Sequence, residues 1–155
     1  MSANSSPRPP RTKTLGIGRV LVAVYGILAL AATGRSVFQI IDRFSEAPLA
    51  FSLSALSAVV YILATIALVA PGAAWYRVAR LTIGFELIGV LVVGTISLVA
   101  PGLLGLHSIN PFGREATVWS AYGLGYLLIP LVLPVLGLLY LRSQRPTAVE
   151  ADVRA

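Results

Sequence analysis

Apolar residues gather in four long runs along the chain, and polar residues are largely confined to the stretches between them. The runs cover residues 17–41, 49–70, 78–100 and 118–141. A helix needs about 20 mostly apolar residues to cross the hydrocarbon core of a bilayer, and each run reaches that length. The pattern therefore predicts an all-α, polytopic membrane protein. Its four transmembrane helices would form an up-down bundle over residues 15–142.

The composition supports this class and narrows the chemistry. Hydrophobic residues make up 57% of the 155-residue chain and charged residues only 12%. A soluble domain of this size keeps much of its surface in water, which such a composition suits poorly. The absence of cysteine excludes disulfides and thiolate metal sites. No catalytic or cofactor motif is present, and the single histidine, His107, is too little for a metal site. We expect a non-enzymatic protein with no cofactor and no bound metal.

The basic residues are distributed unevenly, and this predicts an orientation. Arg35, Arg43 and Arg114 lie at the connections that follow the first and third runs, whereas the other nine of the twelve basic residues lie at the opposite side. The positive-inside rule then places both termini in the cytoplasm, with the protein in a bacterial plasma membrane. Because the basic residues flank apolar runs and do not cluster on a folded face, nucleic acid is not an expected partner.

The two ends of the chain are polar. Residues 1–14 are rich in Ser, Pro and basic residues, so we expect a disordered tail that contacts the anionic inner leaflet. Residues 143–155 form a second cytoplasmic tail. An alternative for the first run is a cleavable signal peptide ending at Ala29-Leu30-Ala31, which would leave three helices. Against it, the apolar run continues past this point, and Arg35 and Gln39 share one helix face.

The sequence Leu-Val-Ala-Pro-Gly closes two of the runs, at residues 68–72 and 98–102. Proline followed by glycine ends a helix, since proline disfavours a helical residue before it and glycine permits a reversal. The two copies indicate either an inverted duplication of the transporter kind or the same stop signal used twice. The helices differ elsewhere, which favours the stop signal.

One acidic residue, Glu86, lies inside the third run. It follows Arg80 by six residues, so at ~1.5 Å per residue it sits about 9 Å from the cytoplasmic boundary. An ionised carboxylate there costs roughly 2.5 kcal/mol or more, so it is expected to find a partner, a proton or water. Depth counting gives Tyr25 and Thr65 as neighbours with hydroxyls able to bind it, and Arg19 or Arg80 as its counter-charge.

Three interpretations of Glu86 remain open from the sequence. The carboxyl group locks the packing of the helices, as interhelical polar contacts do. Alternatively it is a proton-coupled or cation-binding site, since buried carboxyl groups serve proton relays. In the third interpretation it pairs with a basic residue of another membrane protein.

The fourth run holds two prolines, Pro130 and Pro134, spaced four residues apart. Each removes an intrahelical hydrogen bond, so we expect the helix to bend there. Trp119, near the start of this run, is expected at the outer membrane interface. In the third run Gly89 is one of several glycines that indicate close packing of a neighbour.

Three stretches carry a family resemblance: 18–25 (GRVLVAVY), 31–36 (AATGRS) and 44–50 (FSEAPLA). They resemble small four-helix integral membrane proteins of actinobacteria, which have no established activity. The resemblance implies a fold and a host group without a mechanism. Small multidrug resistance transporters share the size and the four-helix plan, but their membrane acid lies in the first helix, whereas Glu86 lies in the third.

These observations favour a protein that acts by association, as an accessory or scaffold subunit beside another membrane protein. The alternative is a small oligomeric transporter or channel that uses Glu86 as a proton or cation site. Four helices enclose little volume for a substrate cavity, which counts against a monomeric carrier.

Overall fold

The computed structural model describes residues 12–108 and 110–144, and every regular element in this part of the chain is helical. There are four α-helices: α1 (Thr12–Arg43), α2 (Pro48–Val69), α3 (Ala73–Val99) and α4 (Ile129–Ser143). Two short helical segments lie between α3 and α4: η1 (Pro101–Leu104) and η2 (Ser120–Tyr126). The all-α prediction is confirmed for the described residues.

Three of the helices are long and apolar enough to cross a membrane. They are α1 from Gly16 onward, α2 and α3. A fourth crossing exists only if η2 and α4 count as one span, and these two segments meet at an angle of 98°. Helical α4 alone is about 22 Å long at ~1.5 Å per residue, which is less than the ~30 Å of a hydrocarbon core.

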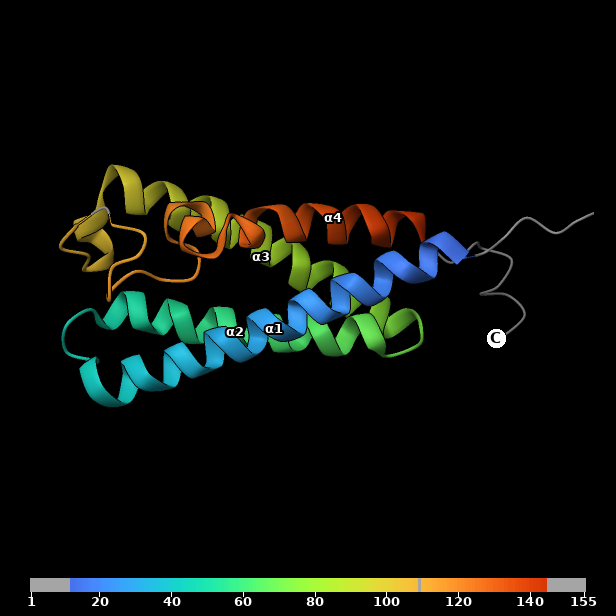
Figure 1. The fold of residues 1–155 in the computed structure, drawn as a ribbon, viewed down its shortest axis with the longest axis horizontal. Coiled ribbons are helices and arrows are strands. Elements are labelled where there is room, and N and C mark those ends of the chain that lie inside the picture. Colours follow the sequence, from blue (N-terminus) through green and yellow to red (C-terminus); the bar gives the residue numbers. More distant parts are fainter. Residues whose placement is uncertain (1–11, 109, 145–155) are drawn as a thin grey trace, which may run out of the picture.

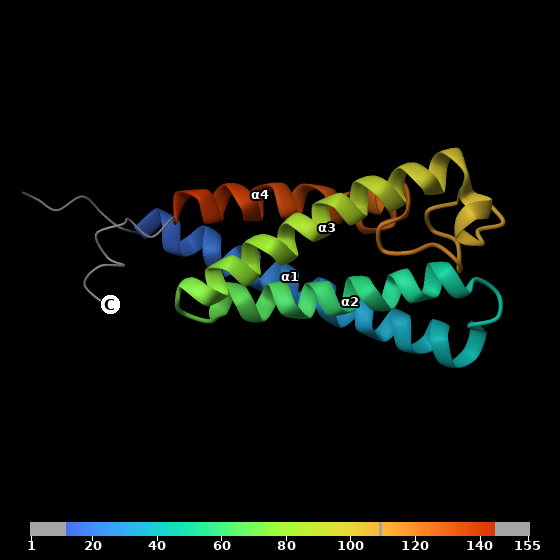
Figure 2. The same ribbon diagram turned by 180° about the vertical axis from the view of Figure 1, so that it is seen from behind.

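The helices form a bundle with two distinct ends (Figures 1 and 2). α1 and α2 pack together along an antiparallel hairpin, α3 packs against α2, and α4 packs against α3. The start of α1, the turn after α2 and the end of α4 lie at one end, which we call the terminal end. The turn after α1 and the long connection after α3 lie at the opposite end, the loop end.

The helix ends follow the predicted stop signals. α2 ends at Val69 and α3 at Val99, each directly before an Ala-Pro-Gly sequence. Gly72 has φ 109°, a backbone conformation that a side chain would strain. α1 begins at Thr12, so residues 12–14, which composition assigned to the tail, are helical. Most of the two predicted tails lies outside the described residues.

The prediction of one continuous helix over 118–141 is wrong. Regular helix begins at Ile129, and the preceding η2 segment turns away from it. Inside η2 three consecutive residues have left-handed backbone angles, with φ of 47°, 60° and 79° at Ala121, Tyr122 and Gly123. Leu127 and Leu128 are also left-handed. Such residues cannot continue the right-handed hydrogen-bond ladder of an α-helix.

Glycine and proline explain where the break falls. A Cβ on Gly123 would lie 2.7 Å from the ring of Pro130, so only glycine fits this close approach. Pro130 stands in the first turn of α4, where its missing N–H is not needed. Pro134 lies inside α4. The predicted bend is therefore present, but it falls at Leu127 and Leu128, before either proline.

Candidate functional site

Glu86 lies on the buried face of α3, where its side chain is 0% exposed. The hydroxyl of Tyr25, on α1, donates a hydrogen bond of 2.7 Å to its Oε2 atom. Tyr25 is as deeply buried as Glu86. The structure thus brings together two of the three residues predicted to form a polar site. Their bond joins α1 to α3 across the core.

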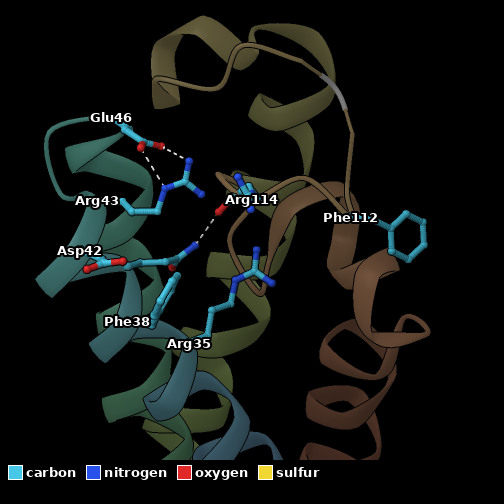
Figure 3. A pocket seen from close by; sticks show the side chains of 8 residues that line it. Arg35, Phe38, Asp42, Arg43, Glu46, Phe112 and Arg114 are labelled. Atoms are coloured by element: carbon cyan, nitrogen blue, oxygen red, sulfur yellow. Dashed lines mark hydrogen bonds and ion pairs between the residues drawn. The ribbon is translucent and has the colours of Figure 1, made fainter.

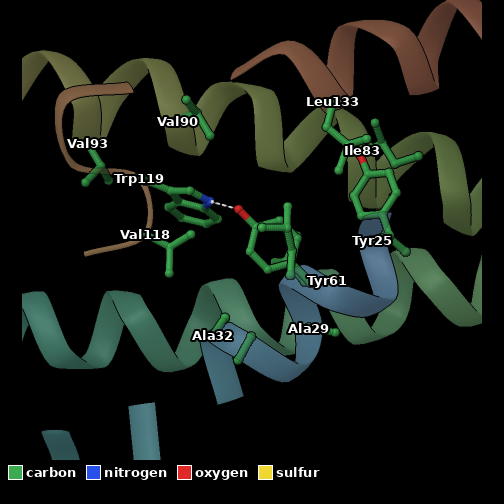
Figure 4. Close-up of a cluster of buried hydrophobic side chains, with 14 of the residues drawn as sticks. Tyr25, Ala29, Ala32, Tyr61, Ile83, Val90, Val93, Val118, Trp119 and Leu133 are labelled. Atoms are coloured by element: carbon green, nitrogen blue, oxygen red, sulfur yellow. Dashed lines mark hydrogen bonds between the residues drawn. The ribbon is translucent and has the colours of Figure 1, made fainter. Parts of the chain in front are cut away.

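The surroundings of this pair are mainly apolar. Tyr25 lies close to Ile83 of α3 and Leu133 of α4 (Figure 4). The second carboxyl oxygen of Glu86, Oε1, is buried without a hydrogen-bond partner in the described structure. A buried polar atom of this kind is costly unless it is satisfied. The carboxyl group of Glu86 therefore has one hydrogen-bonded oxygen, Oε2, and one oxygen without a partner, Oε1.

The expected counter-charge for Glu86 is not found. Among the described residues, the ion pairs join Arg43 to Glu46 and His107 to Glu115. Both pairs lie at the loop end of the bundle. Neither Arg19 nor Arg80 reaches the carboxyl group, because both arginine side chains lie exposed at the surface. Tyr25 takes the role of partner that the sequence assigned to an arginine.

Thr65 does not join the site. Its side chain is half-buried, and its hydroxyl donates to the carbonyl oxygen of Tyr61 in its own helix at 2.7 Å. Its methyl group faces Gly26 of α1, 4.0 Å from where a Cβ would lie on that glycine. Thr65 thus lies beside the residue that follows Tyr25, as depth counting predicted, but its hydroxyl bonds back to its own helix, as Thr hydroxyls in helices commonly do.

Tyr61 and Trp119 form a second buried polar contact beside the first. The indole Nε1 of Trp119 donates to the hydroxyl of Tyr61 at 3.0 Å (Figure 4). The rings of Tyr61 and Tyr25 lie 6.3 Å apart, centroid to centroid, with a tilt of 51°. Two separate buried hydrogen bonds therefore lie side by side, and the rings of Tyr25 and Tyr61 pack between them. Sequence reasoning missed Tyr61, although it lies one helical turn before Thr65 and the same depth count reaches it.

The prediction of Trp119 as an interfacial residue is wrong, because its side chain is only 1% exposed. Gly89 of α3 makes room for the indole, since a Cβ on Gly89 would lie 2.7 Å from the ring. Gly94, further along α3, faces Tyr122 in the same manner. Gly89 and Gly94 thus receive the segment before α4, as their small size predicted, although this neighbour is an irregular segment and not a regular helix. Nothing lies within 4 Å of where a Cβ on Gly84 would stand, so Gly84 does not take part.

Side-chain hydroxyls satisfy the backbone of this irregular segment. Ser97 of α3 accepts a hydrogen bond of 2.8 Å from the N–H of Ala121. Within the segment, Ser120 accepts from the N–H of Thr117 at 2.9 Å, and Thr117 accepts from the N–H of Trp119 at 3.1 Å. Buried backbone groups outside regular structure need such partners. These residues show how a non-helical segment is accommodated inside an apolar bundle.

A second polar region lies at the loop end. A cleft of about 560 Å³ opens between the last turns of α1 and the connection after α3 (Figure 3). Arg43 binds Glu46 through two contacts, from Nε to Oε1 at 2.9 Å and from Nη2 to Oε2 at 2.6 Å. The cleft is lined by Arg35, Phe38, Gln39, Asp42, Arg43, Glu46, Phe112 and Arg114. Charges of both signs line it, which favours no single class of charged ligand.

Arg35 and Gln39, which share one helix face, hold the loop connection onto α1. Arg35 Nη2 donates to the carbonyl oxygens of Gly113 at 3.1 Å and Ala116 at 2.6 Å. Gln39 Nε2 donates to the carbonyl oxygen of Arg114 at 3.0 Å. One Arg35 nitrogen and the Gln39 carbonyl oxygen remain buried without a protein partner. These two buried atoms are the polar groups of this region that no other group of the described structure satisfies.

His107, the single histidine, lies at the loop end and contacts Glu115. Its backbone N–H donates to Glu115 Oε2 at 3.0 Å, and its ring Nδ1 lies 2.9 Å from Oε1. The pKa of Glu115 is lowered, chiefly by the backbone hydrogen bond and then by the bond to the His107 ring. In residues 12–108 and 110–144, no three His, Asp or Glu side chains converge in a way that would hold a metal.

The chain was compared with protein-family models, curated proteins and solved structures, and no match was found.

Proposed function

We propose that the chain is a non-enzymatic, multi-pass protein of the bacterial plasma membrane that acts by association, as an accessory or scaffold subunit of a larger membrane assembly. In this role Glu86 is an internal lock between α1 and α3, and the outer surface of the bundle carries the function.

The enclosed state of Glu86 is the observation that carries this proposal. Tyr25 bonds to it, Tyr61 packs against Tyr25 and Trp119 bonds to Tyr61, and each of these three side chains is almost completely buried. Three described clefts, of which the largest measures about 560 Å³, are lined by residues at the ends or outer faces of the bundle and not by Glu86. An interior filled in this manner supports a structural role for the acid, since a carrier needs a route between its site and water.

The outer face of α1 is the surface that best suits a partner. Within the apolar part of each long helix, 28% of α1 is buried, against 39% for α2 and 33% for α3. Ile27 and Leu30 point away from the bundle and are 64% and 77% exposed. Interfaces between membrane helices form through van der Waals packing of such faces.

Site-specific photo-crosslinking in native membranes tests this proposal. A photoreactive residue at Ile27 or Leu30 is expected to give an adduct with one other membrane protein in a fixed ratio. Leu81 of α3, which is 73% exposed, provides the matched control and is expected to give lipid adducts. Lipid adducts alone at all three positions would contradict the proposal, and adducts between copies of the chain would favour a homo-oligomer.

The orientation of the chain is part of the proposal. Arg77, Arg80 and Arg142 are exposed at the terminal end. At the loop end Arg114 is exposed, whereas Arg35 is bound to carbonyl oxygens and Arg43 to Glu46. This charge difference supports a cytoplasmic terminal end. Because the chain has no cysteine, single cysteines at the exposed positions Ala74 and Ser108 report the orientation directly. An impermeant maleimide is expected to label position 108 in intact cells and position 74 only after permeabilisation; the reverse result would invert the orientation.

A small oligomeric transporter or channel is the second candidate, and the free Oε1 atom of Glu86 is the observation that favours it. The broken segment before α4 adds to this, since discontinuous helices surround the sites of many carriers. Glu86→Gln separates the two functions. A proton or cation flux in proteoliposomes that is abolished by this substitution supports transport. Flux that is absent or unchanged supports the internal lock.

A further inference from the structure

A groove runs between α3 and α4 at the terminal end of the bundle, with a volume of about 370 Å³. Its lining residues are Tyr76, Arg80, Leu87, Val135, Leu138, Leu139, Leu141 and Arg142. Leu87, Val135 and Leu139 form apolar walls on the two helices. The two arginines come from different helices and stand at the same end of the groove. The groove is thus apolar along its length and positively charged at its mouth.

The spacing along the two helices is the same. Arg80 precedes Leu87 by seven residues on α3, and Val135 precedes Arg142 by seven on α4. At ~1.5 Å per residue, each helix separates its arginine from the apolar wall by about 10 Å. The two helices run in opposite directions, so both arginines reach the terminal end. The groove therefore has a positively charged end followed by an apolar stretch, which matches the head group and the acyl chain of an anionic lipid.

A hydrogen bond fixes the helices at this end. The hydroxyl of Tyr76 donates to the carbonyl oxygen of Leu141 at 2.9 Å. Arg80 lies one turn after Tyr76, and Arg142 directly follows Leu141. The bond therefore sets the positions of both arginine backbones relative to each other. Neither arginine forms an ion pair within the described part of the chain.

We propose that this groove binds an anionic phospholipid, with the phosphate at Arg80 and Arg142 and an acyl chain along Leu87, Val135 and Leu139. Basic pockets between membrane helices bind anionic head groups in this manner. The charge is complementary, because both charged groups in the lining are positive. The cleft at the loop end differs in this respect, since Asp42 and Glu46 line it with its arginines.

Native mass spectrometry of the purified full chain tests the site. The chain is equilibrated with phosphatidylglycerol or with phosphatidylcholine, and the retained lipid is counted. Arg80→Gln is compared with Arg77→Gln, which removes the same charge from an exposed position three residues away and outside the groove. Each groove arginine is expected to contribute about fivefold to affinity for phosphatidylglycerol. Arg80→Gln, and more strongly Arg80→Gln with Arg142→Gln, is therefore expected to weaken binding, while Arg77→Gln leaves it nearly unchanged.

Two further arms identify the ligand. Val135→Trp fills the apolar wall and is expected to reduce phosphatidylglycerol binding with both arginines present. Soluble glycerol phosphate is expected not to displace the lipid. Equal losses in Arg77→Gln and Arg80→Gln would overturn the site in favour of general surface charge. Displacement by glycerol phosphate would overturn the lipid assignment in favour of a simple anion site. These outcomes are independent of whether the chain associates with another protein.

Discussion

At the scale of single residues, the hydrogen bond from Tyr25 to Glu86 constrains the packing of the bundle. It joins two helices that are far apart in the sequence, and both side chains are fully buried. A buried polar group that loses its partner costs about 1–3 kcal/mol, whereas replacing both partners with apolar groups of similar shape is close to neutral. If the bond contributes to stability, each single replacement is therefore expected to destabilise the protein by more than the double replacement implies.

A double-mutant cycle measures this contribution. Tyr25→Phe leaves the carboxyl group of Glu86 without its donor, so we expect a loss of about 1–3 kcal/mol in unfolding free energy. Glu86→Leu strands the Tyr25 hydroxyl and is also expected to destabilise. The double variant is expected to lose at least ~1 kcal/mol less than the sum of the two single losses. The measurement is equilibrium unfolding in mixed micelles, and strictly additive losses would show that the bond contributes nothing.

Gly89 and Gly84 form a matched pair for testing the packing of Trp119. A Cβ on Gly89 would overlap the indole ring, whereas nothing lies within 4 Å of a Cβ on Gly84. Gly89→Ala is expected to destabilise by about 1–3 kcal/mol through overpacking. Gly84→Ala is expected to be neutral or to stabilise by up to ~1 kcal/mol through helix propensity. Thermal unfolding of the two variants decides this, and equal behaviour would contradict the buried position of the indole.

The contact between His107 and Glu115 predicts a pH dependence at the loop end. The pKa of Glu115 is lowered from its ordinary value of 4.5 in the folded chain, first by the His107 backbone N–H and then by its ring. A lowered folded pKa means that the contribution to stability is present above 4.5 and is lost as the pH falls through the lowered value. The effect is expected to be small because the pair lies at the surface.

An NMR titration of the His107 amide tests this dependence. Its resonance is expected to shift with a midpoint below 4.5, as the N–H loses its carboxylate acceptor. Glu115→Gln is the control and is expected to abolish that transition. A midpoint at or above 4.5 in the unsubstituted chain would contradict the contact.

At the scale of elements, the segment before α4 separates this bundle from a simple up-down arrangement. Ala121, Tyr122, Leu127 and Leu128 all have positive φ without being glycine. Each such residue costs roughly 1–2 kcal/mol. Ser97, Thr117 and Ser120 offset part of this cost by bonding the backbone, and Trp119 adds a large buried surface. The strain is confined to the segment that enters the core beside the polar contacts.

Glycine substitution distinguishes this segment from a regular helix. Ala121 and Ala29 are both 8% exposed, but Ala121 has φ 47° and Ala29 lies inside α1. Ala29→Gly is expected to lose about 1 kcal/mol or more from helix propensity and the lost methyl group. Ala121→Gly loses a similar methyl group but relieves left-handed strain, so it is expected to be at least ~1 kcal/mol less harmful. Equal losses in unfolding free energy would favour the continuous helix that the sequence predicted.

The difference between predicted and observed elements has a physical explanation. The first three helices could be located from hydropathy because a continuous apolar run defines a regular helix, and a Pro-Gly sequence marks the ends of α2 and α3. The fourth run is equally apolar, but hydropathy does not report backbone conformation. The partners that stabilise its irregular start, such as Ser97, lie on another helix. No local signal in residues 118–128 shows that such partners exist.

The candidate site, like the helices, could be predicted only in part from the sequence. Tyr25 was found because the rise per residue of a helix is constant, so depth follows from counting. Depth does not show which acceptor a hydroxyl takes, so Thr65 was expected at the site although its hydroxyl bonds to its own helix backbone. Tyr61 lies one turn away on nearly the same face and was not singled out. The burial of Trp119 could not be predicted from the sequence, because it depends on the break before α4.

At the scale of the whole molecule, the two ends of the bundle differ in how far their arginines are bound within the chain. At the loop end, Arg35 and Arg43 are engaged with the chain's own carbonyl and carboxylate groups. At the terminal end, Arg80 and Arg142 face the groove between α3 and α4. The core between the ends is filled by aromatic rings around Glu86. These three features together support a protein whose activity lies at its surface.

The mass of the particle extracted from native membranes tests the central claim of association most directly. Membrane discs bounded by a polymer keep the chain with its neighbours and its lipids, and native mass spectrometry reads their composition. We predict that the discs contain this chain and a second membrane protein in one fixed ratio, and that Glu86→Gln, which keeps a hydrogen-bond acceptor for Tyr25, retains that ratio. Discs that contain only copies of this chain and lipid would contradict the proposal.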